Sequence, residues 1–154
     1  MSDWTEDSLQ ALLEAFLDRT LPAEQWTHHA HLLVGTMLAR RMPQDALLPR
    51  LRQAISGYNL ASGGQNTDSA GYHESITAFY AAVLGAYARR TAHLPLAEAA
   101  RRLLDSPLED RKIVLRAYQA ETLKTVAARL GYVAPDIAGF DPARLVAEVF
   151  ADAG

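Results

Sequence analysis

The stretch from residue 70 to residue 90 constrains the fold of this chain more than any other part of the sequence. Its large apolar residues recur at helical spacing and form one broad stripe, which consists of Tyr72, Ile76, Phe79, Tyr80, Val83, Leu84 and Tyr87. A second face carries the small residues Ala78, Ala81 and Gly85, which suit close contact with another helix. A helix with two such faces is expected at the centre of a domain, so the stretch predicts an all-α protein.

The rest of the chain also shows helical periodicity, and no segment shows the alternation typical of a β-strand. The other expected helices span residues 8–20, 28–41, 44–56, 95–104, 107–130 and 142–150. Proline disrupts a helix interior, so Pro49 is expected to lie in the first turn of its helix. A bend is expected near Gln119. We therefore expect residues 1–154 to form one domain, a helical bundle of about seven helices.

The composition excludes several classes of function. The chain has no cysteine, which rules out disulfides, thiolate catalysis and cysteine-bound zinc. A net charge of −3 argues against a nucleic-acid partner. No apolar run approaches the ~20 residues of a membrane span, and the acidic N-terminal segment differs from a signal peptide. We therefore expect a cytoplasmic protein with neither a nucleic-acid nor a membrane partner.

Four of the five histidines lie in two short stretches, residues 26–31 and residues 71–77. Each stretch opens a predicted helix. His28 and His31 are one turn apart, which directs both inward or sideways. His73 is expected in the first turn of the second helix. If these helices pack side by side, the three imidazoles converge near two helix N-termini.

One interpretation of this cluster is a metal site. Neutral imidazoles at positions i and i+3 of one helix, a third from another helix and a carboxylate are suitable ligands for zinc, iron or manganese. The metal ligands would be His28, His31 and His73.

A second interpretation is acid–base chemistry without a metal. His73 would exchange protons with a ligand, opposite one of the other two imidazoles. Glu74 is a candidate carboxylate, although on a helix it points about 100° away from His73. Tyr118 or Glu121 from a later helix is therefore the expected orienting partner. A third interpretation is structural, with the histidines capping helices or binding loop carbonyls.

The order of four motifs resembles that of a group of small bacterial proteins described only as uncharacterised: His28-x-x-His31, Tyr72-His73-Glu74-Ser75-Ile76-Thr77, Tyr118-x-x-Glu121-Thr122-Leu123 and Pro135-Asp136. The resemblance covers roughly residues 10–136 and carries no assigned activity. It implies that Tyr118, Glu121 and Arg129 belong with the histidine site. The chain departs from the pattern at His29 and Ala30, which stand where the group has Arg-Glu.

These observations predict a small enzyme or binding protein that acts on a small molecule, with an anionic ligand among the options. The glycine-rich loop at residues 58–70 is expected to border or cover the histidines. The alternative is a non-catalytic interaction module, with a homodimer as one form of it. Such a module would recognise its partner through basic residues, namely Arg101, Arg102, Arg111 and Lys112.

Overall fold

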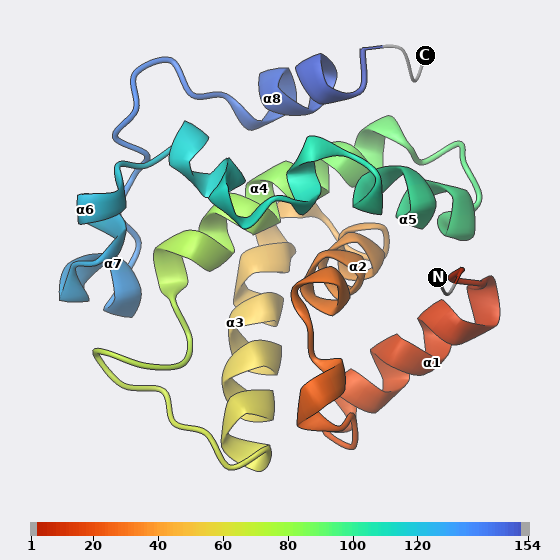
Figure 1. Ribbon diagram of the computed structural model, residues 1–154, viewed down its shortest axis with the longest axis horizontal. Helices are drawn as coiled ribbons and strands as arrows, with labels where there is room; N and C mark the ends of the chain where they lie inside the picture. The colour runs from red at the N-terminus through yellow and green to blue at the C-terminus, as the bar shows by residue number, and fades with distance from the viewer. Residues whose placement is uncertain (1–2, 152–154) are drawn as a thin grey trace.

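The computed structural model describes residues 3–151, and within them it contains helices and no strand (Figure 1). The α-helices are α1 (Glu6–Leu17), α2 (His28–Ala39), α3 (Gln44–Ala61), α4 (Glu74–Arg90), α5 (Leu96–Leu104), α6 (Ala120–Leu123), α7 (Val126–Leu130) and α8 (Pro142–Val149). Three 3-10 helices join them: η1 (Ala23–Gln25), η2 (Pro107–Glu109) and η3 (Arg111–Arg116). The all-α prediction is confirmed. In the described part of the chain, the number of helices exceeds the expected seven or so.

Helix α4 is the central element, as its two apolar faces predict. Helices α2, α3, α7 and α8 all pack against it, and Figure 1 shows α4 between α8 above and α3 below. The small face admits a close neighbour, because the side-chain amide of Gln44 donates to the carbonyl of Ala81 at 3.0 Å. On the other side, a Cβ added at Gly35 of α2 would lie 2.6 Å from Leu84 Cδ1. The glycine therefore lets α2 approach α4 closely.

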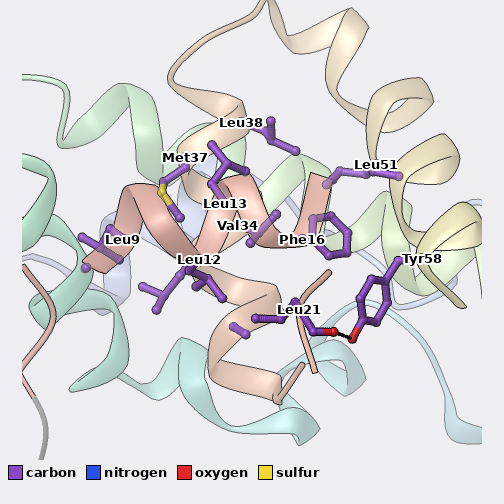
Figure 2. Packing of buried hydrophobic residues seen from close by; sticks show 14 of the residues in the cluster. Leu9, Leu12, Leu13, Phe16, Leu21, Val34, Met37, Leu38, Leu51 and Tyr58 are labelled. Carbon is purple, nitrogen blue, oxygen red and sulfur yellow. Dashed lines mark hydrogen bonds between the residues drawn. The ribbon is translucent and has the colours of Figure 1, made fainter. Parts of the chain in front are cut away.

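Two apolar clusters flank α4. The first lies between α1, α2 and α3, and Figure 2 shows how leucines of α1 meet Val34 and Met37 of α2. At its edge the buried hydroxyl of Tyr58 donates to the carbonyl of Leu21 at 2.6 Å. The second cluster joins α4 to α5, η3 and α8. Helices α2 and α3 both pack against α4, and the candidate site lies where these three helices meet.

The predicted helix over residues 107–130 is wrong, because the chain forms η2, η3, α6 and α7 there. Two polar residues interrupt it. Asp110 has an extended backbone, and its carboxylate accepts from the amide of Lys112. Thr125 is extended too, and its hydroxyl accepts from the amide of Ala128. Each side chain starts a new helix and so competes with continuation of the previous one.

Two further boundaries differ from expectation. Helix α3 continues to Ala61 and holds Pro49 in its second turn instead of its first. Helix α4 begins at Glu74 and not near residue 70, because Gly71 has a left-handed backbone with φ +82°. The connection from α3 to α4 therefore occupies residues 62–73, and His73 becomes the N-cap of α4.

Candidate ligand-binding pocket

Helix α2 begins beside a pocket. Thr27 is its N-cap, and the threonine hydroxyl accepts from the amide of Ala30 at 3.1 Å. This cap fixes the first turn, so that His28 and His31 both line a pocket of about 340 Å³ between α2, α3, α4 and η3. We call it the central pocket. Its walls are mostly apolar, with Leu32, Leu51, Ile55, Ile76 and Leu84 among the lining residues.

The side chain of His31 lines the pocket, and its ring also stacks on that of Trp26. Its ring centroid lies 3.8 Å from that of Trp26, which also stacks on Phe16 at 4.1 Å. The Nδ1 atom of His31 lies 2.8 Å from the carbonyl of Thr27, which can only accept, so Nδ1 carries the proton. Desolvation by the pocket walls lowers the pKa of His31 to about 4. The ring is therefore neutral near pH 7, with an acceptor lone pair at Nε2.

The side chain of His28 is half-buried, and its imidazole is also expected to be uncharged near pH 7. Burial lowers its pKa, and the positive charge of Arg111 lowers it further. Its ring meets that of Tyr80 edge to face, with centroids 6.0 Å apart. Within residues 3–151, neither His28 Nε2 nor Trp26 Nε1 has a hydrogen-bond partner, although both atoms are buried. Such orphaned atoms are costly in a folded protein unless another molecule satisfies them.

His73 has a structural role. As the N-cap of α4, its Nδ1 accepts from the amide of Ile76 at 3.1 Å, and its Nε2 lies 2.8 Å from the carbonyl of Leu123. Both ring nitrogens are thus occupied. Among the described residues, no group of three or more His, Asp or Glu side chains is arranged to hold a metal. A metal bound through His28, His31 and His73 would have to displace one of the two hydrogen bonds of His73, and the metal site stays a prediction.

Glu74 lines another hollow, together with Arg52 and Tyr72. The guanidinium of Arg52 donates to both its carboxylate oxygens, at 2.9 and 2.6 Å, and the hydroxyl of Tyr72 donates at 2.6 Å. The Arg52 guanidinium holds the pKa of the Glu74 carboxyl below its usual value. The buried carboxylate therefore has its partners, and it does not line the central pocket.

Tyr118 and Glu121 do not line the central pocket with the imidazoles either. Tyr118 is buried, and its hydroxyl donates to the carbonyl of Val133. Burial raises its pKa to about 12. Glu121 is exposed on α6. Arg129, grouped with them by resemblance, donates to the carbonyl of Gly71 at 2.9 Å and so supports the end of the connection.

Sequence reasoning missed three residues of the pocket: Trp26, Tyr80 and Arg111. Tyr80 belongs to the apolar stripe of residues 70–90 and Trp26 opens the histidine stretch at residues 26–31, and the structure stacks Trp26 on His31 and sets Tyr80 against His28. Arg111 was grouped with Arg101 and Arg102 on a basic surface. The structure separates them, because Arg101 and Arg102 pair with Glu98 on their own helix, whereas Arg111 begins η3 at the rim of the pocket. Only the fold reveals that difference.

Two hollows adjoin the central pocket. The loop-side hollow, about 560 Å³, lies under the α3–α4 connection and is lined by His31, His73 and residues of that connection. The connection thus borders the histidines, as expected. The charged hollow, about 720 Å³, lies at the opposite end, where His29 Nε2 is 3.2 Å from Glu109.

Comparison with known protein families, with curated proteins and with solved structures finds no match for this chain. No helix in residues 3–151 is long and apolar enough to cross a membrane. The chain is thus an all-α protein whose site must be interpreted from its own geometry.

Proposed function

We propose that this protein binds a small organic anion with an apolar body in the central pocket. The volume of about 340 Å³ falls within the range of about 300–1,000 Å³ typical of small-molecule sites. Apolar walls with a few convergent polar groups are also typical of such sites. The polar groups here include those of His28, His31, Thr77, Tyr80 and Arg111.

Arg111 is the observation that carries the choice of an anion. Its guanidinium lies at the rim of the pocket, and no ion pair within residues 3–151 involves it. A guanidinium often recognises a carboxylate through two parallel hydrogen bonds. The apolar body would then extend along Leu84 and Ile76 toward the Trp26–His31 stack.

The two histidines would act as neutral hydrogen-bonding groups. His31 offers an acceptor at Nε2, whereas the buried and unpaired Nε2 of His28 would reach a bound molecule only after a rotation of its ring. If the bound molecule carries an acidic proton, the base would be His28. The function that we propose is binding, and proton transfer would follow only for a ligand with an acidic proton.

The test uses two isosteric pairs of probes, because the natural ligand is unidentified. The pairs are 2-naphthoate with 2-naphthamide, and octanoate with octanamide. Binding is followed by the fluorescence of Trp26 in a Trp4→Phe background. We expect Arg111→Gln to weaken binding of the carboxylates about fivefold, or about 1 kcal/mol for a solvent-facing charge pair. The amides should bind equally to both proteins.

Arg50→Gln is the matched control, because Arg50 lies on α3 outside the pocket and its side chain donates a hydrogen bond to Gln53. It should leave all four affinities unchanged. The proposal is overturned if neither carboxylate shows saturable binding, or if Arg111→Gln and Arg50→Gln change the carboxylate affinities equally.

A further inference from the structure

The central pocket and the loop-side hollow adjoin each other. Five residues line both of them, namely Trp26, His31, Ile55, Ile76 and Thr77. The charged hollow shares other residues with the central pocket, and Arg111 is one of them. The order along the site is therefore a charged end, an apolar middle and a third compartment beneath the α3–α4 connection.

The third compartment differs in chemistry from the other end. Its polar lining comes from amides and hydroxyls, including those of Asn59, Ser62 and Gln65. No Asp, Glu, Lys or Arg side chain lines it within the described part of the chain. The charged hollow, in contrast, is lined by Glu109, Asp110, Arg111 and Lys112.

The wall formed by the connection is held in place by Asn66. Its side-chain amide donates to the carbonyl of Ser56 at 2.9 Å, and its side-chain oxygen accepts from Asn59 and from the amide of Tyr72, each at 3.0 Å. Gly71 completes the turn, because a Cβ there would lie 2.0 Å from the carbonyl oxygen of Gln65. The compartment is thus pre-formed.

We propose that the loop-side hollow binds an uncharged hydrogen-bonding group, such as a primary amide or a hydroxyl, at the end of the ligand opposite its anion. A charged group there would lose water without gaining a counter-charge, which is unfavourable. His31 stands at the junction, and its Nε2 acceptor faces a donor on such a group. This assignment rests on the proposed function, since it concerns the other end of the same ligand.

The experiment compares three rigid probes: 2-naphthoate, 6-carbamoyl-2-naphthoate and naphthalene-2,6-dicarboxylate. Affinities come from titration of Trp26 fluorescence, and location comes from backbone amide shifts in NMR spectra. We expect the carbamoyl probe to bind about tenfold more tightly than the dicarboxylate. Only the carbamoyl probe should shift the amides of Gly64 and Gly71 relative to 2-naphthoate.

A gain-of-function variant makes the test sharper. Gln65→Lys adds a positive charge to the wall of the hollow, so it should raise affinity for the dicarboxylate by a larger factor than affinity for 2-naphthoate. Gln53→Lys, on the exposed side of α3, is the control and should change neither.

If 2-naphthoate binds but the carbamoyl probe produces no shifts at Gly64 and Gly71, or the dicarboxylate binds equally well, this inference is overturned and the proposed function stands. If 2-naphthoate itself does not bind, both are overturned.

Discussion

At the residue scale, His31 and His73 differ in whether a ring nitrogen is left for a ligand. Sequence periodicity predicts that His31 and His73 share one site, because both lie near the start of a helix. A shift of a few residues in the start of α4 makes His73 an N-cap with both nitrogens occupied. His31 keeps a free Nε2, because only its Nδ1 is held by the carbonyl of Thr27. The first residue of α4 depends on Gly71 and Asn66, and the spacing of apolar residues carries no information about their effect.

His31 should titrate with a pKa of about 4, well below the ordinary value of 6.5. Between these two values the unfolded chain binds a proton at His31 that the folded protein does not, so acidification across that range lowers stability. Because the ring also contacts solvent, we expect about 1 kcal/mol from this residue.

The measurement is an NMR titration of the imidazole Cε1–H signals, with His31→Gln used for assignment. The variant should also lose less stability than the wild type on acidification. A midpoint near 6.5 for His31 would show that the pocket walls do not desolvate it.

At the element scale, the sequence predicts helices well where apolar spacing is strong. Residues 70–90 were expected to form the central helix, and α4 occupies that position because large and small faces both need neighbours. Residues 107–130 carry similar spacing, yet Asp110 and Thr125 cap new helices inside the stretch. That break brings Arg111 to the pocket, so the element most difficult to predict also contributes the group that we propose to bind an anion.

The start of α4 should depend on the Glu74 carboxylate. We expect Glu74→Gln to lower the free energy of unfolding by about 1–2 kcal/mol at neutral pH, because it loses the charge-assisted bonds from Arg52. The folded pKa of Glu74 lies below 4.5, so this stabilisation is present above pH 4.5 and is lost as pH falls through the folded pKa.

Chemical denaturation at several pH values checks this prediction. Wild type and variant should differ most at neutral pH and converge on acidification, while Glu121→Gln, on exposed α6, should match the wild type throughout. A difference that stays constant down to low pH would mean that charge plays no part.

At the scale of the whole molecule, some basic residues form ion pairs on the surface, whereas Arg111 lines the central pocket. The basic residues of α5 are paired within their own helix, while Arg111 faces a pocket that α2, α3 and α4 enclose. An interaction module would need the basic residues to act together on one surface, and that alternative stays a prediction. The pocket forms only when α2 and α3 both pack against α4, an arrangement that no local sequence pattern encodes.

The most direct measurement of the central claim is a methyl and amide NMR map of the protein with 2-naphthoate. Ligand-induced shifts and intermolecular contacts should centre on Ile55, Ile76 and Leu84 in the central pocket. The methyl groups of Leu9 and Leu13, in the cluster beneath α1, should not change. Shifts centred elsewhere on the molecule, or none at the three pocket residues, would contradict the assignment of this pocket as the ligand site.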